Sequence, residues 1–598
     1  MHAFLPLIGA LCILGANSFV SGSKRSFSEQ VRHRVRREPG APPPIDCLLG
    51  QWSEWGPCNP CGNEKYRSRS VLKYGQFGGE RCMQSLGEKQ RCVADQVCPE
   101  GETDCGKDFT CANGFCIKQR LMCNTEDDCG DFSDEDNCED INPRPPCRDR
   151  FIDVSEIGRK AGRGINILGM QPKDTPFYNE FYNGLCNRER DGNSGTYYRK
   201  PWNVAVLNYE TKGDKSFSNE NYENQVTAVR EMYAERHQHF QASFSLKLTP
   251  TETDDNTSTD ANADFSFFEN TSISHFLKES NGKDQHFLHV KGTIELGNFI
   301  MRSRDIRLTE TFLDDLKYLP SDYDMGEYFK FLETHGTHYA RTGTVGGKYE
   351  LLYVLDKQSM KTKGVSAEDV KACLGYSAKL SSTSTGFDLN TEVKGGDCKQ
   401  ATIKKLGNST RGAIIHNVIS RIQGGTTVVL ERLKEMLSVK DKTVDIEDYI
   451  QWAATIPEAP AVIEYEPHPI SELVPLKLHN SYVKKQNLDR AVEDYVAEYD
   501  VCKCQPCQNG GTVVLVNGEC ICGCTPYFKG VACQIPKSEF EPGQGGTNGG
   551  WSCWSSWSPC VRGERTRTRA CNNPAPESGG QPCAGAALET GYCAETIR

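Results

Sequence analysis

The chain has 598 residues, 29 of them cysteines, and a net charge of −11 at pH 7. This mild acidity argues against a nucleic-acid partner. The cysteines crowd into 47–147 and 502–593, and the stretch between holds only Cys186, Cys373 and Cys398. Short cysteine-dense segments are typical of secreted modules too small to build a core. We therefore expect one large domain flanked by small disulfide-stapled modules.

The N-terminus has the form of a targeting segment. Residues 4–15 are almost entirely apolar and small residues follow at 21–23, which predicts a secretory signal peptide over residues 1–22. The basic run at 34–37 resembles a dibasic processing site, so residues 23–37 are interpreted as a pro-segment, with a solvated charge run as the alternative. No later stretch is continuously apolar for the length of a membrane helix, so the mature chain is expected to be secreted in soluble form.

Residues 42–99 combine tryptophans with alternating arginines. Trp52-Ser-Glu-Trp55 is followed by Arg67 and Arg69, one residue apart. Alternate positions of a strand face the same side, so both guanidinium groups are placed to stack on the indole faces and replace a core. The pattern resembles a thrombospondin type 1 repeat.

The same pattern returns at 551–598, after a linker at 536–550 that is rich in Gly and Pro. Its members are Trp551, Trp554, Trp557, Arg565, Arg567 and Arg569. Resemblance to the repeat implies C-mannosylation of Trp52, Trp551 and Trp554. A packing role for these tryptophans is compatible with that modification.

Residues 103–140 end in an acidic run between Cys129 and Cys138. Carboxylates this close repel one another unless a hard cation sits among them, and calcium takes about six to eight oxygen ligands. The pattern resembles a low-density-lipoprotein-receptor class A module. Asn124 stands where that family more often has Asp, which is expected to weaken the site. The resemblance implies a structural calcium ion held by side chains of Asn124, Asp128, Asp134 and Glu135 and backbone carbonyls of Leu121 and Glu126.

Residues 501–535 contain six closely spaced cysteines beside Cys502, and a turn signal at 509–511. The spacing resembles an epidermal-growth-factor-like (EGF-like) module. Cys502 is left over beside these six, and the last repeat has five cysteines, an odd number. We therefore predict that Cys502 is bonded into the last repeat and folds it back across the linker at 536–550.

The central stretch carries the most specific motif. His335-Gly-Thr-His338-Tyr is followed, after six residues, by Gly346-Gly347. A metal site is not favoured, because no third ligand stands at a known spacing from the two histidines. The motif resembles the signature of the membrane-attack-complex/perforin family, in which an aromatic residue usually replaces His335. Further segments extend the resemblance: Gly164–Gly169, Asn179–Cys186, Tyr197–Asn203 and Phe287–Gly292.

The resemblance implies a multidomain α+β chain in which residues 141–500 form a bent antiparallel sheet with two helical clusters that unfurl into membrane hairpins. Gly346 and Gly347 are then interpreted as a hinge, where the bent sheet needs backbone freedom without side chains. A bond between the cysteines around the second hairpin would restrict its release. Two disulfides are expected in this domain, Cys147–Cys186 and Cys373–Cys398.

Two regions alternate apolar and polar residues as membrane-barrel strands do. The first hairpin region spans residues 240–268, and the second lies around residues 376–422. An ordinary half-buried strand pair is the alternative that alternation alone leaves open. Open hairpins would leave backbone groups unpaired in lipid, so insertion is expected to need many copies side by side. On the far side of the second region, an apolar stretch over 401–422 also fits helical spacing. The predicted lipid-facing residues are Phe240, Ala242, Phe244, Leu246, Leu248, Ala263, Phe265, Phe267, Tyr376, Ala378 and Leu380.

Three sequons stand at Asn256, Asn270 and Asn408. Asn256 falls between the strands of the first hairpin, so a glycan there would have to cross the bilayer. Either that sequon is unoccupied or its glycan slows insertion.

The family resemblance implies a terminal complement pore former that joins a nascent membrane attack complex, polymerises and inserts β-hairpins. Implied partners are earlier terminal complement components, further copies of the chain, the target cell membrane and a host inhibitor of the second hairpin. The alternatives are a nucleating subunit of the same complex and a non-lytic adhesion or scaffold protein. No nucleophile elbow, zinc-protease motif or P-loop is found, so an enzyme is not predicted.

Overall fold

The computed structural model describes residues 38–592 except for 99–104, 140–143, 149–151, 193, 214–217, 223–224, 227, 230–244, 247–266, 269–272, 274–275, 279, 281–282, 375–380, 384–385, 389–413, 439–445 and 538–548. The chain divides into two compact units, Met1–Glu38 and Pro39–Arg598, and every described helix and strand belongs to the second. The predicted signal peptide and pro-segment lie outside the described residues.

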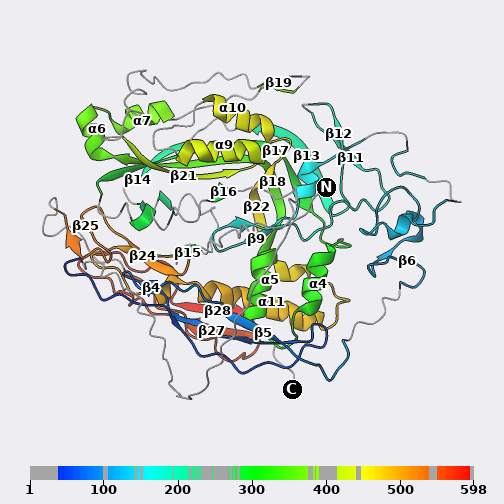
Figure 1. Cartoon of the computed structure of the whole chain (residues 1–598), viewed down its shortest axis with the longest axis horizontal. Coiled ribbons are helices and arrows are strands. Elements are labelled where there is room, and N and C mark those ends of the chain that lie inside the picture. The colour runs from blue at the N-terminus through cyan, green and yellow to red at the C-terminus, as the bar shows by residue number, and fades with distance from the viewer. Residues whose placement is uncertain are drawn as a thin grey trace, which may run out of the picture. The chain divides into compact units, whose positions relative to one another are not determined.

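A nine-stranded sheet organises the middle of the chain, and it is antiparallel throughout, as predicted for the α+β class. Its two long strands, β17 (Gln285–Met301) and β18 (His338–Asp356), pair along most of their length. β13 and β14 pair with β17, whereas β21 and β22 pair with β18 (Figure 1). The shorter strands are β9 (Gly164–Asn166), β10 (Gln171–Pro172), β13 (Val204–Gly213), β14 (Ser218–Tyr222), β16 (Phe267–Phe268), β21 (Ile415–Gln423) and β22 (Ala461–Pro469).

A bulge in β17 keeps the apolar side chains on one face. Before the bulge, the residues that face the larger core are at even positions: Leu288, Val290 and Ile294. After the bulge, Phe299 faces the same core from an odd position. The register between β17 and β18 shifts between Glu295 and Gly297, and one extra residue reverses the alternation of a strand. The sequence pattern therefore fits the core only because the strand is bulged.

Helices cover the sheet, and α5 and α6 are capped at both ends by local residues. The Asp324 carboxylate accepts the N–H of Glu327 (3.1 Å) at the start of α5, and Gly336 ends that helix with a φ of +95°. Asp356 and Gly364 do the same for α6. In Figure 1, α9 and α10 lie beside β21, whereas α4, α5 and α11 gather near β5, β27 and β28. The helices are α1 (Glu156–Lys160), α4 (Glu310–Tyr318), α5 (Met325–His335), α6 (Lys357–Lys363), α7 (Ala367–Leu374), α9 (Thr427–Ser438), α10 (Ile446–Thr455) and α11 (Ser481–Glu498), with 3-10 turns at Gln119–Leu121, Ser133–Glu135, Ile470–Leu473 and Val501–Lys503.

The small modules consist of short strands and disulfides. In the first repeat the strands are β1 (Leu48–Leu49), β2 (Glu64–Ser68), β3 (Val71–Lys73), β4 (Gly75–Gln76) and β5 (Gly87–Arg91). The other small strands are β6 (Phe109–Thr110), β7 (Cys116–Ile117), β8 (Asp153–Val154), β11 (Arg188–Arg190), β12 (Tyr197–Arg199), β15 (Ser245–Leu246), β19 (Ser381–Thr383), β20 (Gly386–Asp388), β23 (Thr512–Val516), β24 (Glu519–Gly523), β25 (Phe528–Lys529), β26 (Ile535–Pro536), β27 (Glu564–Thr568) and β28 (Leu588–Tyr592). Nine disulfides stabilise the first repeat, the class A module and the EGF-like module: Cys47–Cys82, Cys58–Cys92, Cys61–Cys98, Cys105–Cys116, Cys111–Cys129, Cys123–Cys138, Cys504–Cys520, Cys507–Cys522 and Cys524–Cys533.

The predicted tryptophan–arginine ladders are present in both repeats. The Arg67 guanidinium lies 4.9 Å from the ring centre of Trp52 and 4.5 Å from that of Trp55. In the last repeat, Arg569 lies 4.2 Å from the ring centres of both Trp551 and Trp554. Stacked cations therefore take the place of an apolar core. C-mannosylation of these tryptophans stays a prediction.

The last repeat is tied back to the rest of the chain. Cys502 is bonded to Cys553, as the cysteine count predicted. Glu493 of α11 also receives hydrogen bonds from Arg565 (2.8 Å) and from the indole N–H of Trp557 (3.1 Å). One covalent bond and one charged contact thus hold this repeat against its neighbours.

Candidate functional site

The partners of β18 change at the predicted hinge. β22 pairs with β18 as far as Gly346, opposite Ala461, and β21 takes over from Lys348, opposite Gln423. The bulge of β17 lies directly across, because Gly346 pairs with Glu295. The strand that pairs with β18 therefore changes within a few residues of Gly346 and Gly347.

The two glycines are needed for space. A Cβ on Gly346 would lie 1.8 Å from the carbonyl oxygen of Ile294, and one on Gly347 would lie 2.4 Å from Cδ1 of Ile456 and 2.9 Å from Cζ2 of Trp452. Neither glycine has a positive φ. The close contacts explain why side chains are absent at these two positions. Hinge motion itself stays a prediction.

Replacing Gly346 by Ala is expected to destabilise the chain, because the new methyl group would push β17 away from β18. Overpacking of this kind costs about 1–3 kcal/mol of unfolding free energy. Urea unfolding followed by intrinsic fluorescence measures the loss. Gly192→Ala is the matched control, since a Cβ there meets nothing within 4 Å. Equal stability of the two variants would contradict the steric argument.

The signature motif joins α5 to the sheet. The Thr337 hydroxyl donates to the carbonyl of Ile165 (3.1 Å) and accepts the N–H of Ile167 (2.9 Å), which fixes β9 beside the start of β18. The His335 ring lies 4.7 Å from that of Phe331 and its Nε2 is 2.6 Å from Asp315, so the histidine occupies the aromatic position of the motif. Burial lowers the pKa of His335, and Asp315 opposes that effect. These contacts indicate a structural role for the motif.

Two acidic side chains of the class A module are buried. Asp128 and Asp134 are 1% and 0% exposed. The Asn124 amide donates to Asp128 (2.7 Å), and the backbone N–H of Asn124 donates to Glu135 (2.7 Å). Burial raises the pKa of Asp128 to about 7, and the Asn124 amide opposes the shift. In the part of the chain that is described, no three His, Cys, Asp or Glu side chains are arranged around a common metal position.

The chemistry of this donor set nevertheless fits calcium. All predicted ligands are oxygens, and the buried carboxylates carry a desolvation cost that a cation would offset. The Glu126 carboxylate accepts a hydrogen bond from Arg199 (2.8 Å). Glu126 therefore has only its backbone carbonyl to contribute to a calcium ion, as the resemblance implied.

The first hairpin region is held by two different sheets. β15, which contains the predicted Leu246, pairs in parallel with β23 of the EGF-like module. β23 and β24 continue to β4 of the first repeat, so one four-stranded sheet joins three distant stretches of sequence. β16, which contains the predicted Phe267, pairs with β21 of the central sheet opposite Ile422. Both described ends of this region are therefore attached to folded partners.

A buried carboxylate reinforces this attachment. Glu519, at the start of β24, is 4% exposed and lies 2.7 Å from the ammonium of Lys278 and 2.8 Å from the guanidinium of Arg81. Lys278 follows the first hairpin region, and Arg81 belongs to the first repeat. Around them, Phe276 packs in one apolar cluster with Val516 of β23. The EGF-like module thus clamps the flank of the hairpin region by charge and by apolar contact.

Most of the other predicted site residues fall where the structure gives no description. The end of the second hairpin region does fall on described residues. Ile415–Gln423 is strand β21 of the central sheet, so the helical alternative for that part is wrong. Cys147 and Cys186 are bonded, whereas the partner expected for Cys373 lies outside the described residues. The predicted residues outside the description are Phe240, Ala242, Phe244, Leu248, Ala263, Phe265, Tyr376, Ala378, Leu380, Asn256, Asn270, Asn408 and Cys398.

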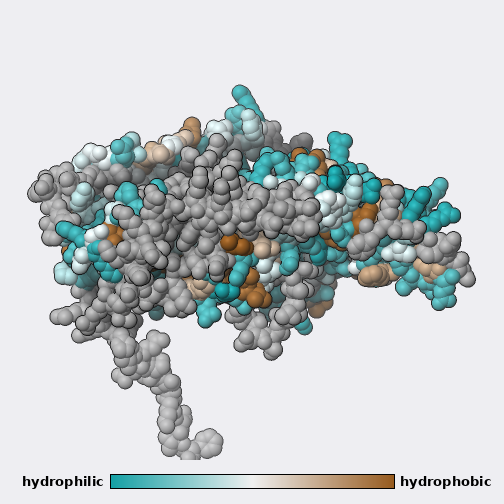
Figure 2. Space-filling view, turned by 90° about the horizontal axis from the view of Figure 1, so that it is seen from above, coloured by the Kyte–Doolittle hydropathy of each residue, from teal (hydrophilic) through white to brown (hydrophobic). Residues whose placement is uncertain are grey.

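The described surface shows scattered apolar side chains. Figure 2 shows separate hydrophobic patches among hydrophilic ones on the face it presents. Exposed apolar residues include Tyr197 (42%) and Ile300 (40%). Among the helices of the described residues, none has both the length and the apolar composition needed to cross a bilayer.

Sequence reasoning missed the ion pairs between modules. Glu519 and Lys278 are 241 positions apart, and Glu493 and Arg565 are 72 apart. Each residue alone has the appearance of an ordinary solvated charge. No local sequence pattern indicates such pairs, so they are found only in the folded chain.

Family models match four of the predicted modules. The MAC/Perforin domain model matches residues 159–505, and the low-density lipoprotein receptor class A model matches 103–138. The thrombospondin type 1 model matches 50–98 and 549–596.

Several relatives are similar along most of the chain. Complement component C9 of Oncorhynchus mykiss is 39% identical over 566 residues, which cover 92% of this chain and 97% of that one. Complement component C8 alpha chain of Oryctolagus cuniculus is 32% identical over 583 residues, which cover 94% and 96%. Complement component C7 of Homo sapiens is 32% identical over 561 residues, which cover 92% and 62%.

Proposed function

Because this chain belongs to the MAC/Perforin family, we propose that it is a terminal complement pore former of the C9 type. The chain is secreted as a soluble monomer and joins a nascent membrane attack complex built by earlier complement components. It then polymerises with further copies and inserts two β-hairpins from residues 240–268 and from the region around 376–422. The assembled chains cross the target membrane as a multi-pass β-barrel, whose formation lyses the cell. A host inhibitor acts on the second hairpin, and no enzymatic activity is part of this function.

The observation that carries the proposal is the attachment of the first hairpin region. Its described ends are short strands, one on the central sheet and one on the EGF-like module. The hairpin region is paired with a different strand at each end. If it detaches from one of these strands, it can extend its pairing along the other. Exposed strand edges then call for neighbouring copies, which couples insertion to polymerisation.

Complementation of depleted serum tests this function. The purified chain is added to serum that lacks C9, with sensitised erythrocytes as targets, and haemoglobin release is measured. Restored lysis supports the C9 role. Restoration only in serum that lacks C8 would instead assign a nucleating subunit, and binding to primed cells without lysis in either serum would assign an adhesion or scaffold role.

We further propose that the class A module holds one calcium ion through Asn124, Asp128, Asp134 and Glu135. When bound, the ion neutralises buried carboxylates and supplies the small module with a rigid centre. The chain's own oxygens provide every side-chain ligand, and the carbonyls of Leu121 and Glu126 complete the set.

Removal of calcium is expected to lower the melting temperature of the module and to expose it to proteases. Scanning calorimetry of the full chain with EDTA, and again after calcium is restored, measures the effect. The Asp134→Asn variant is expected to have a lowered melting temperature that does not change when calcium is removed or restored. Asp136→Asn is the matched control, because this exposed acid lies in the same run and is not a predicted ligand. Identical curves with and without EDTA would overturn the calcium site.

A further inference from the structure

The class A module shares an apolar cluster with the MAC/Perforin domain. Phe181 of that domain is buried in one cluster with Ile117 and Leu121 of the module, and Tyr178 and Trp202 pack against the same cluster. A module this short has little apolar core of its own, so side chains of the larger domain complete it. The contact between the two is therefore part of the interior of the module.

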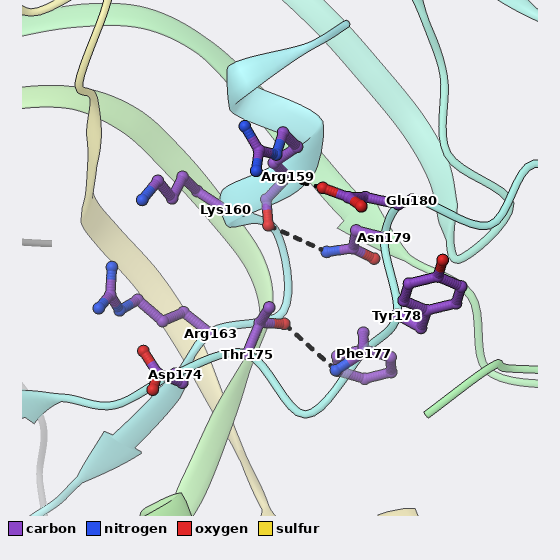
Figure 3. Close-up of a pocket in the computed structure, with 9 residues that line it drawn as sticks. All are labelled: Arg159, Lys160, Arg163, Asp174, Thr175, Phe177, Tyr178, Asn179 and Glu180. Atoms are coloured by element: carbon purple, nitrogen blue, oxygen red, sulfur yellow. Dashed lines mark hydrogen bonds and ion pairs between the residues drawn. The ribbon is translucent and has the colours of Figure 1, made fainter. Parts of the chain in front are cut away.

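The surface that receives the module is fixed from behind by hydrogen bonds. The Asn179 amide donates to the carbonyls of Arg159 (3.3 Å) and Ala161 (2.8 Å), and Figure 3 shows the first of these bonds. The Asn203 amide donates to the carbonyl of Tyr178 (2.9 Å). The module thus docks on residues whose positions are set by the MAC/Perforin domain. We call residues 178–186 the receiving segment.

A charged contact of this interface falls on a predicted calcium-ligand residue. Arg199 of β12 donates two N–H groups to the Glu126 carboxylate, the second of them at 2.8 Å. Its guanidinium also lies 3.9 Å from the ring centre of Tyr182 and donates to the carbonyl of Leu185 (2.9 Å). The side chains of Arg199 and Glu126 are 11% and 19% exposed, so the pair is largely shielded from water. Paired bonds of this kind fix the orientation of both partners.

The other predicted backbone ligand also contacts the receiving segment. A Cβ on Gly184 would lie 2.6 Å from Cδ2 of Leu121, so the two chains touch closely there. The neighbouring Arg120 donates to the carbonyl (3.1 Å) and to the side-chain oxygen (3.0 Å) of Asn183. Both residues predicted to offer a backbone carbonyl to calcium, Leu121 and Glu126, therefore have side chains that are held by the MAC/Perforin domain.

Arg307 adds a contact at the far end of the predicted ligand loop. Its guanidinium lies 4.1 Å from the ring centre of Phe115 and donates to the carbonyl of Cys129 (3.3 Å). Cys129 directly follows the predicted ligand Asp128. The loop that carries the predicted ligands is thus contacted from the MAC/Perforin domain near its start, in its middle and near its end.

Such contacts affect how tightly a metal ion is held. Residues that orient metal ligands from outside typically contribute about 10–100-fold to metal affinity. A backbone carbonyl depends on them especially, because it moves only with the chain that carries it. Linkage is reciprocal, so any factor by which docking raises calcium affinity is also the factor by which calcium favours docking.

We propose that docking of the class A module on the MAC/Perforin domain raises the affinity of the module for calcium, and that bound calcium in turn keeps the module docked. The inference rests on the calcium site proposed above. Arg199 is then a positioning residue, which acts on the ion through Glu126. Loss of calcium frees the module from the receiving segment, so the ion governs an interface as well as the fold of the module.

Removal of the Arg199–Glu126 pair tests the first half of the proposal. Arg199→Met combined with Glu126→Gln removes the pair without changing the net charge. Calorimetric titration of the full chain with calcium is expected to show about tenfold weaker binding. Lys118→Met combined with Asp108→Asn is the matched control, because it removes an exposed pair of the same module and is expected to leave calcium affinity unchanged. Equal affinities of the two double variants would overturn the coupling.

A second variant covers the case in which the first folds poorly. Arg307→Lys keeps the positive charge but loses the planar group that stacks on Phe115. Calcium affinity is expected to fall in this variant as well, by a smaller factor. An affinity equal to that of the unaltered chain would contradict the role given to this contact.

Hydrogen exchange of the receiving segment tests the second half. Residues 178–186 supply no predicted calcium ligand, so the ion can affect their amides only through docking. Addition of EDTA to the unaltered chain is expected to speed exchange in this segment, and calcium is expected to slow it again. Calcium binding that leaves this exchange unchanged would overturn the coupling but keep the calcium site. Absence of calcium binding to the unaltered chain would overturn both.

Discussion

A disulfide between Ser245 and Leu515, both changed to Cys, is expected to reduce lysis of complement-primed erythrocytes to the level of cells without the chain. The two positions are register partners across β15 and β23. Neighbouring strands lie about 4.8 Å apart, which suits a disulfide. If the first hairpin region must leave the EGF-like module to insert, this bond blocks the step. Mild reduction, limited to the new bond, is expected to restore lysis.

The controls separate locking from general damage. Ser245→Cys alone has no partner on β23 and is expected to lyse normally. A second cross-strand disulfide, Lys65→Cys with Gln90→Cys, joins register partners within the first repeat and leaves the hairpin region untouched. Haemoglobin release is compared for oxidised and reduced samples of each variant. Undiminished lysis by the locked chain would remove residues 240–268 from the inserting part and favour a docking role.

Replacing Glu519 by Gln is expected to accelerate self-polymerisation without any priming complex. The change removes the carboxylate that holds Lys278 and Arg81. Breaking a buried ion pair costs about 3–5 kcal/mol, and the side chains of Lys278 and Arg81 are 45% and 40% exposed, so we expect a loss of about 1–2 kcal/mol here. The same free energy lowers the barrier to release, so the rate rises about five- to thirty-fold.

Light scattering of the purified chain measures this rate, and thermal unfolding measures the stability. Glu88→Gln is the matched control, because it breaks an exposed pair with Arg67 in the first repeat. That variant is expected to polymerise and unfold as the unaltered chain does. An unchanged polymerisation rate in Glu519→Gln, together with a lowered melting temperature, would show that the clamp stabilises the fold without controlling release.

Features encoded by local spacing were predictable from the sequence. The Trp52 ladder follows from strand alternation over a few residues, and the Cys502–Cys553 bond follows from counting cysteines. The signature motif located the turn from α5 into β18. Gly346 was placed correctly at the rearrangement of the sheet, but the need for space came from Ile294, which lies on another strand.

Features that depend on the meeting of distant segments were not predictable. Nothing near Glu519 in sequence shows that it is buried against Lys278. The far side of the second hairpin region fitted two periodicities, and pairing with β18 decided for the strand. In each case the missing information is a tertiary contact.

The bond between Cys502 and Cys553 has a consequence for how this chain tolerates damage and change. A protease that cuts between these two positions produces two polypeptides that remain one particle, and they separate only on reduction. The ion pair of Glu493 with Arg565 helps to keep the cut piece in register. The linker at 536–550 is thereby relieved of the task of tethering the last repeat, so insertions, deletions or nicks within this linker are expected to accumulate without cost to the assembled molecule.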